Sequence, residues 1–281
     1  MTGLPVRAAA LRIPLHPLGP YVSLLRNARL VWELCKRDVS GRYRGSMGGM
    51  FWAFLNPLLM LAIYSFVFGY IFKSRWTAVE SGNVNFAIIL FIGLIISNFF
   101  SECLNRAPVL ITSNPNYVKK VIFPLETLSW VTVGTGLFHA LISSIVLVVA
   151  LIATGTPVSP AAALFPVLLL VFLPMVAGVT WLFSALGVYF RDTQQIMQVL
   201  TTSLVFLAPI FYPRSSLPEQ YRWLLSLNPL TFVVESARDL ILWGRLPNAI
   251  DALTYVLASL LVSWLGWLVF NATRKGFADV I

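Results

Sequence analysis

The longest uncharged stretch of the chain runs from Thr127 to Phe190 and reads TLSWVTVGTGLFHALISSIVLVVALIATGTPVSPAAALFPVLLLVFLPMVAGVTWLFSALGVYF. No Asp, Glu, Lys or Arg interrupts its 64 residues. A helix needs roughly 20 residues to cross the hydrocarbon core of a bilayer, so this stretch holds two crossings. Thr154–Pro160 (TGTPVSP) supplies the turn between them. The stretch therefore predicts an integral membrane protein built from helices.

The composition of the whole chain supports this prediction. Hydrophobic residues make up 58% of the 281 residues and charged residues only 11%. Soluble domains are about 45–50% apolar and about 25% charged, so this chain cannot cover a globular surface with polar groups. None of the apolar stretches alternates as the strands of a transmembrane barrel do. The expected fold class is an all-α integral membrane protein.

Four further uncharged stretches bring the expected number of transmembrane helices to six. The crossings are predicted at about residues 50–72, 85–104, 127–152, 161–187, 193–211 and 252–272. An even number of crossings places both termini on one side, where the connecting segments carry 14 of the 20 Lys and Arg residues. The positive-inside rule assigns that side to the cytoplasm. This bias accounts for the net charge of +9 without a nucleic-acid partner, for which the sequence has no recognition motif.

The N-terminal part precedes the first crossing. Residues 1–21 contain several prolines and predict a flexible cytoplasmic extension. Residues 22–39 predict an amphipathic interface helix at the cytoplasmic membrane surface, because apolar and basic side chains take opposite faces. Its apolar stripe is Leu24, Ala28, Val31, Cys35 and Val39, widened by Leu25 and Trp32. A generic surface anchor is the alternative reading.

Arg42, Tyr43 and Arg44 follow this helix where the first crossing enters the bilayer. Two guanidinium groups beside a phenol suit a phosphate or pyrophosphate head group. The two arginines equally suit plain positive-inside determinants. Further along, the cytoplasmic loop 105–124 is long for a simple connection, which indicates a docking surface for a soluble partner. A short helix is expected there after Pro108, broken at Asn114-Pro115.

The segment from residue 211 to 251 is too apolar for a solvated outer loop. It predicts two short helices within about residues 213–243 that dip into the outer leaflet as a gate, or a helical hairpin lying flat on the surface. Glu235, Arg238 and Asp239 share one helical face at spacings of three and four, so they form a charged group in apolar surroundings.

Several kinds of chemistry are absent from the sequence. It contains no phosphate-binding loop for ATP and no nucleophile elbow, so no catalytic residue is assigned. Its two histidines, His16 and His139, offer no metal or haem site. The crossings carry almost no ionisable groups, which argues against an ion-coupled carrier. The chain is expected to lack its own energy source and to hold no cofactor.

The motifs of the chain fall in the order found in one family. The stretch Arg37–Phe68, with Lys119–Pro124 (KKVIFP), Tyr189–Asp192 (YFRD), Ala208–Pro213 (APIFYP) and Leu227–Thr231 (LNPLT), resembles the permease subunits of ABC type 2 polysaccharide exporters. These are the Wzm-like O-antigen and TagG-like teichoic-acid permeases. The resemblance covers about residues 22–275, so the whole of residues 22–281 is expected to form one transmembrane domain.

The resemblance implies partners and roles that the residues alone do not. It implies a homodimer with a channel, two separate ATP-binding cassette subunits that hold ATP and Mg²⁺, and an undecaprenyl-linked polysaccharide as cargo. The membrane would be a bacterial inner or plasma membrane. Arg42, Tyr43 and Arg44 would receive the lipid pyrophosphate, and Glu235, Arg238 and Asp239 would hold the outer gate. Residues implied to couple the chain to the ATPase are Arg37, Asp38, Asn105, Arg106, Asn114, Lys119 and Lys120.

Aromatic side chains near the first crossing and the cytoplasmic entrance suit a sugar channel, because flat rings stack on sugar C–H faces without selecting one sugar. The candidates are Phe51, Trp52, Tyr64, Phe68 and Phe190. Two other functions stay open. One is an ABC permease for a small lipophilic drug or a lipid. The other is a membrane-embedded enzyme acting on lipid-linked sugars, which would turn over substrate without an ATP-binding subunit.

Overall fold

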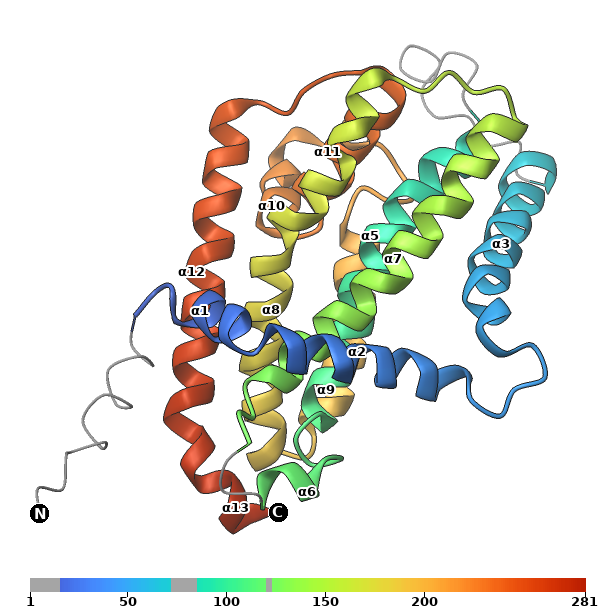
Figure 1. Cartoon of the computed structure of the whole chain (residues 1–281). Coiled ribbons are helices and arrows are strands. Elements are labelled where there is room, and N and C mark those ends of the chain that lie inside the picture. Colours follow the sequence, from blue (N-terminus) through green and yellow to red (C-terminus); the bar gives the residue numbers. More distant parts are fainter. Residues whose placement is uncertain (1–15, 72–84, 120–122) are drawn as a thin grey trace, which may run out of the picture.

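A computed structural model of the chain describes residues 16–71, 85–119 and 123–281. Every regular element in these ranges is helical, which confirms the predicted all-α class. Four long helices run side by side and form a bundle (Figure 1). They are α5 (Phe86–Arg106), α7 (Thr127–Ala153), α8 (Phe165–Tyr189) and α12 (Ala249–Thr273). The shorter helix α9 (Thr193–Leu207) lies beside them.

Five helical segments of the described ranges are long and apolar enough to cross a membrane. They are Gly49–Phe68, Phe86–Val109, Thr127–Ala153, Pro160–Tyr189 and Ala249–Val280. α9 lies where a sixth crossing is predicted, but its 15 residues span only about 22 Å, against about 30 Å of hydrocarbon. The count of six therefore stays a prediction.

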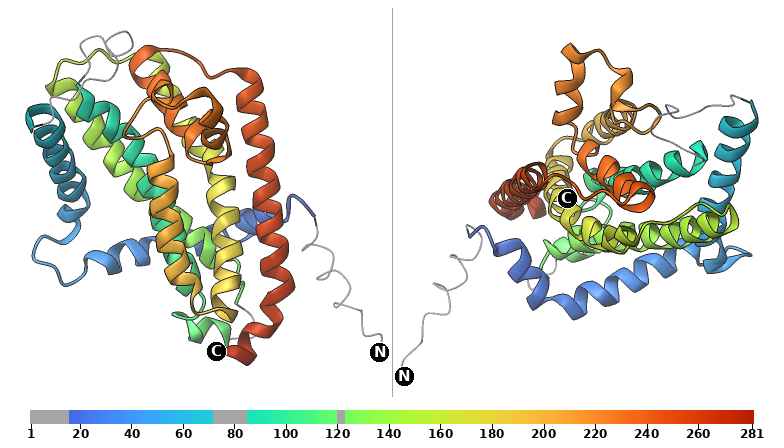
Figure 2. Two further views of the ribbon diagram at one scale, coloured as in Figure 1. Left: turned by 180° about the vertical axis from the view of Figure 1, so that it is seen from behind. Right: turned by 90° about the horizontal axis from the view of Figure 1, so that it is seen from above.

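Helix α5 forms the centre of the bundle and α3 its edge. In the most apolar window of each segment, 83% of the residues are buried for Phe86–Val109 but only 11% for Gly49–Phe68. The latter segment comprises the 3-10 turn η2 (Gly49–Phe51), α3 (Trp52–Tyr64) and the start of the π-helical turn η3 (Ser65–Ile71). Seen from above, α3 stands across the bundle from α12 (Figure 2). Its apolar side chains are therefore left for lipid or for another protein surface.

Helices α8 and α12 approach each other most closely at two glycines. A Cβ built on Gly266 would lie 2.0 Å from the carbonyl oxygen of Gly178, and one built on Gly178 would lie 2.5 Å from that of Val262. No side chain fits at such a distance, so the contact is made by backbone against backbone. Small residues serve membrane helices in this way because lipid supplies no hydrophobic force between them.

The N-terminal segment crosses the bundle as two helices, α1 (Gly19–Arg26) and α2 (Ala28–Tyr43), rather than as one helix over 22–39 (Figure 1). The chain breaks at Asn27, and the helical part begins inside the stretch expected to be a loose extension. Residues 1–15 of that extension lie outside the described residues. The face of α2 on the bundle is Val31, Leu34 and Val39, whereas Leu25 and Trp32 of the predicted stripe are exposed.

The connection between α5 and α7 differs in detail from expectation. After α5 the chain continues through η4 (Ala107–Val109) to α6 (Pro115–Val118), so Pro115 begins a helix instead of breaking one, as its preset φ allows at a first position.

Short helical elements make up the remaining connections. η5 (Pro160–Leu164) leads into α8. Between α9 and α12 lie η6 (Arg214–Ser216), η7 (Glu219–Tyr221), α10 (Arg222–Leu227), α11 (Thr231–Arg238) and η8 (Asp239–Trp243). The chain ends with η9 (Arg274–Gly276) and α13 (Phe277–Val280).

Candidate functional site

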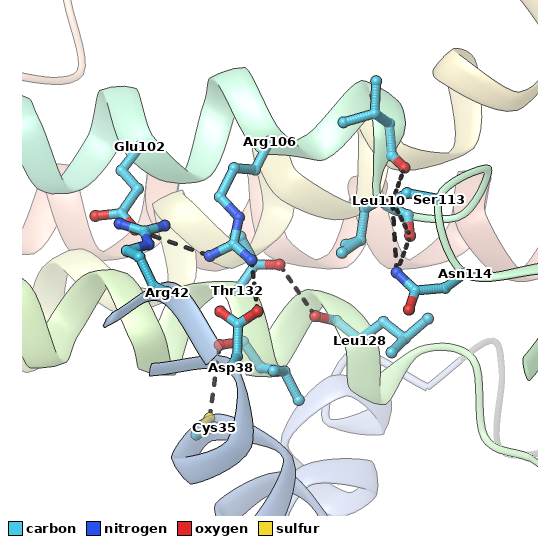
Figure 3. Close-up of polar contacts among 12 residues, drawn as sticks. Cys35, Asp38, Arg42, Glu102, Arg106, Leu110, Ser113, Asn114, Leu128 and Thr132 are labelled. Atoms are coloured by element: carbon cyan, nitrogen blue, oxygen red, sulfur yellow. Dashed lines mark hydrogen bonds and ion pairs between the residues drawn. The ribbon is translucent and has the colours of Figure 1, made fainter. Parts of the chain in front are cut away.

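Four charged side chains join the transverse helix α2 to the last turns of α5 (Figure 3). The guanidinium of Arg42 lies 2.7 Å from the carboxylate of Glu102, and that of Arg106 lies 2.8 Å from Asp38. Arg106 also approaches Glu102 at 3.8 Å. Positive and negative groups thus alternate along one line, Asp38–Arg106–Glu102–Arg42, which we name the charge ladder.

The sequence builds this ladder by helix spacing. Asp38 and Arg42 lie four residues apart on α2, and Glu102 and Arg106 lie four apart on α5, so each helix presents two charges on one face. Both helices read acid then base along the chain, and they cross with Asp38 beside Arg106 and Arg42 beside Glu102. Opposite charges therefore meet in one register of the two helices. The Glu102 side chain is 18% exposed, so breaking its pairs leaves a charge that water compensates poorly. The ladder therefore fixes where α2 rests on the bundle.

His139 on α7 brings a third helix to Glu102. Its Nδ1 lies 2.9 Å from a Glu102 carboxylate oxygen, and the Tyr43 hydroxyl lies 3.2 Å from its Nε2. With the proton on Nδ1, the imidazole donates to Glu102 and accepts from Tyr43. Burial raises the pKa of the Tyr43 hydroxyl, which keeps it protonated as a donor. Glu102 thus receives contacts from both α2 and α7.

A pocket of about 440 Å³ opens next to the ladder. Its polar lining includes Arg37, Asp38, Arg42, Arg106, Asn114 and Tyr117. Arg37 donates a hydrogen bond to the Tyr117 hydroxyl and lies 5.9 Å from the centre of that ring. Since Tyr117 belongs to α6, the pocket connects α2 to the loop between α5 and α7.

Four of the seven residues with an implied role in ATPase coupling lie together. Arg37, Asp38, Arg106 and Asn114 meet at this pocket. Asn105 faces elsewhere and accepts a hydrogen bond of 2.8 Å from Thr201 of α9. Lys119 is exposed at the end of α6, and Lys120 lies outside the described residues.

Two of the three expected pyrophosphate residues meet at His139. Arg42 lies 3.4 Å from its Nδ1 and pairs with Glu102, Tyr43 lies 3.2 Å from its Nε2, and Arg44 is exposed at the end of α2. The expected channel aromatics are dispersed. Phe51 and Trp52 are exposed at the start of α3, Tyr64 and Phe68 lie with ring centres 6.4 Å apart, and Phe190 is exposed after α8.

Arg238 has a different environment from the one its neighbours suggest. It is 2% exposed, and its guanidinium donates to the carbonyl oxygens of Ile89, Pro209 and Ile210. Glu235 lies 3.7 Å from Arg214. Arg238 therefore ties α11 to α5 and to the chain that leaves α9.

Sequence reasoning missed Glu102 as the centre of the ladder, and it interpreted His139 as a polar packing residue rather than a ligand. The available signal was an ionisable group at the edge of each apolar stretch, because such groups are costly in a membrane and are usually paired. Which groups pair depends on how α2 crosses the bundle, and spacing within one segment does not contain that information.

Comparisons with known proteins identify the family of the chain. The family described as "ABC-2 type transporter" matches residues 29–242. The O-antigen export system permease protein RfbA of Myxococcus xanthus is 30% identical over 90% of this chain and 95% of its own length. A protein of the same name from Klebsiella pneumoniae is 26% identical over the same shares. The polysialic acid transport protein KpsM of Escherichia coli is 27% identical over 87% of this chain and 93% of its own. The matched region contains the whole charge ladder and α11, and the chain belongs to the ABC-2 type transporter family.

Proposed function

We propose that this chain is the permease subunit of an ATP-driven exporter that moves a lipid-linked polysaccharide from the cytoplasm to the outer side of a bacterial inner or plasma membrane. The observation that carries the proposal is similarity over about nine-tenths of the chain to permeases named for O-antigen export. Relatives named for polysialic acid transport add a second polymer, so the cargo class is a polysaccharide rather than one sugar.

The proposed assembly is a homodimer with two ATP-binding cassette subunits, which hold ATP and Mg²⁺. Six crossings place both termini in the cytoplasm, on the side rich in Lys and Arg. The ATPase docks at the lower end of the molecule in Figure 1, where α6 lies. Lys119 lies at the end of this surface, and Asn105 links its base to α9. Lys120, which we also assign to ATPase coupling, lies outside the described residues.

In this proposal the charge ladder transmits the ATPase motion. A displacement of α6 pulls on α2 through Arg37 and Tyr117, and the Asp38–Arg106 pair carries α5 with it. Because α2 leads directly into the first crossing, the same displacement opens the cytoplasmic entrance. The ladder is a coupling device that binds neither ATP nor sugar.

Cargo enters beside the first crossing. Arg44 is the guanidinium at this entrance that no pair in the ladder engages, so it receives the lipid pyrophosphate, while Arg42 and Tyr43 hold the helix end in place. The aromatic rings of Phe51, Trp52, Tyr64, Phe68 and Phe190 provide stacking surfaces along the route. Glu235, Arg238 and Asp239 belong to the outer gate.

Depletion of the protein in its source cell tests the proposal. Spheroplasts are probed with a membrane-impermeant glycan label before and after lysis. We expect surface polymer to fall and a lipid-linked pool to appear only after lysis. Unchanged surface polymer with no internal pool, in a strain without a redundant exporter, would discard the polysaccharide assignment and favour a drug or lipid exporter.

A further inference from the structure

A second pocket, of about 320 Å³, opens at the other end of the molecule. It lies between α11, η8 and the chain that follows α9, in the upper half of Figure 1 and away from α2 and α6. Its charged and aromatic lining consists of Arg214, Glu235, Arg238, Asp239, Trp243 and Arg245. The gate role proposed above requires no ligand here, so the chemistry of this pocket needs its own explanation.

The wall of the pocket is built before any ligand arrives. Arg238 is buried, and its guanidinium holds three carbonyl groups, one from α5 and two from the chain that follows α9. At the rim, Gly244 takes a φ of 67°, and the following amide of Arg245 donates to the Asp239 carbonyl at 3.0 Å. Trp243 and Arg245 are thereby fixed on either side of a tight turn. A site supported in this way loses little entropy when it binds.

The mixture of charges selects the kind of ligand. The carboxylates of Glu235 and Asp239 disfavour phosphate and other small anions, and three guanidinium groups disfavour metal cations. The polar lining disfavours a lipid tail or an apolar drug. Acceptors and donors side by side suit a ring with neighbouring hydroxyl groups, and an indole offers a flat face to its C–H side.

We propose that this pocket is an exit subsite that binds one pyranose unit of the exported polymer. The inference rests on the proposed function, because a polysaccharide is the cargo that would pass it. Arg214 and Glu235 form an ion pair at 3.7 Å, longer than a good hydrogen bond, so a sugar hydroxyl that approaches from the pocket can accept from the guanidinium and donate to the carboxylate. Trp243 stacks on the ring, and Arg245 donates from the rim. Weak, repeated binding of successive units hinders the polymer from sliding back between ATP-driven steps.

The test uses the full-length permease with its ATP-binding partner in nanodiscs. The probes are methyl glycosides of glucose, N-acetylglucosamine and glucuronic acid, and saturation-transfer NMR measures their binding. We expect at least one probe to bind with a Kd of about 1 mM, and Trp243→Ala to weaken it by roughly tenfold. Trp243→Phe keeps a flat ring and should stay within about threefold. Trp223→Ala, which removes an exposed tryptophan of α10 outside the pocket, is the matched control and should change nothing.

Arg245→Gln provides a second variant whose exposed position leaves folding intact, and it should weaken binding by about threefold to tenfold. The subsite is overturned if no probe binds, if Trp243→Ala and Trp223→Ala bind alike, or if inorganic phosphate displaces the sugar. Failure of the proposed function looks different. In that case the probes bind as expected but depletion leaves surface polymer unchanged. Conversely, a protein that supports export but binds none of the sugar probes contradicts the subsite and leaves the proposed export function standing.

Discussion

At the scale of single residues, Glu102 is the centre of the charge ladder, because its carboxylate faces Arg42, Arg106 and His139 at once. Replacing it with Gln keeps its shape and removes its charge. Two guanidinium groups then face each other across a neutral amide. We expect Glu102→Gln to lower the free energy of unfolding by about 1.5–3 kcal/mol, as for hydrogen bonds to charged groups. Thermal unfolding in detergent measures this change.

Glu33 on α2 offers a matched control for that substitution. It pairs with Lys36 at 2.9 Å, but its side chain is 60% exposed. Exposed pairs one helical turn apart contribute about 0.5 kcal/mol or less, so Glu33→Gln should leave the melting temperature nearly unchanged. Equal losses in the two variants would show that Glu102 stabilises the protein no more than a surface carboxylate does.

The Asp38–Arg106 pair allows its role in coupling to be separated from its role in folding. We expect Asp38→Arg and Arg106→Asp each to reduce export about tenfold or more while ATP hydrolysis continues, because each places like charges together. The double substitution restores the pair with its polarity reversed, but it places the new carboxylate beside Glu102, so it should recover part of the export. Export rate and ATPase rate are measured together in proteoliposomes. A double variant as defective as the single ones would mean that the pair does not transmit motion.

Cys35 reports how tightly α2 lies on α7. Its thiol approaches the carbonyl oxygen of Val131 at 3.5 Å, and burial, with a smaller effect of Asp38, raises its pKa to about 11. The reactive thiolate is therefore scarce at neutral pH, and maleimide labelling should be about 300-fold slower than for an ordinary thiol of pKa about 8.5. Labelling should keep rising tenfold per pH unit up to about pH 10.5.

The comparison thiol is Arg29→Cys on the exposed face of α2, in a background without Cys35 and Cys103. Its labelling should level off near pH 9, as an unperturbed thiol does. Mass spectrometry after timed quenching gives both rates, with Cys103 replaced by Ser when Cys35 is followed. A Cys35 rate that also levels off near pH 9 would show that α2 lifts from the bundle in solution.

At the scale of elements, the contact of α8 with α12 depends on having no side chain at Gly266. Gly266→Val places three carbons where the Gly178 carbonyl already lies, so the helices must separate or tilt. We expect a loss of about 3 kcal/mol or more, at or above the upper end for overpacked cores, with little folded protein recovered. Gly41→Ala on α2 is the control, since a Cβ there meets nothing within 4 Å. Size-exclusion chromatography and thermal unfolding compare the two variants, and a stable monodisperse Gly266→Val protein would contradict the close packing.

Element boundaries show what the sequence could and could not predict. The uncharged stretches placed four of the long helices within a few residues, because length and hydropathy alone set them. The break at Asn27 and the start of α6 at Pro115 were not predicted, although a proline at a first helical position is a local signal for the second of them. The ladder was not predicted either. Its four charged residues are visible in the sequence, and two of them, Asp38 and Arg106, were named as coupling residues. Their pairing depends on the angle and position at which α2 packs across α5.

At the scale of the whole molecule, the short helix α9 raises the question of how the chain crosses the membrane there. The helix ends at Leu207, and the backbone from Ala208 to Ile210 is buried but irregular. Irregular backbone at membrane depth is tolerated only where protein satisfies its polar groups. Arg238 does so by donating to the carbonyl oxygens of Pro209 and Ile210. A crossing made of α9 and this supported segment is therefore physically acceptable.

With such a crossing, residues 194 and 215 lie on opposite sides of the membrane. Single cysteines at Gln194, Ser215 and Val280, in a background with Cys35 and Cys103 replaced by Ser, are exposed enough to label. An impermeant maleimide should label Ser215→Cys in intact cells, and Gln194→Cys and Val280→Cys only after permeabilisation. Labelling of Gln194→Cys from outside, or of both α9 flanks from the same side, would reduce the crossings to five. The termini would then lie on opposite sides, and the positive-inside assignment of the C-terminal cations would be wrong. Arg238→Ala should shift the result toward that outcome, because the two carbonyl groups would lose their donor in the bilayer.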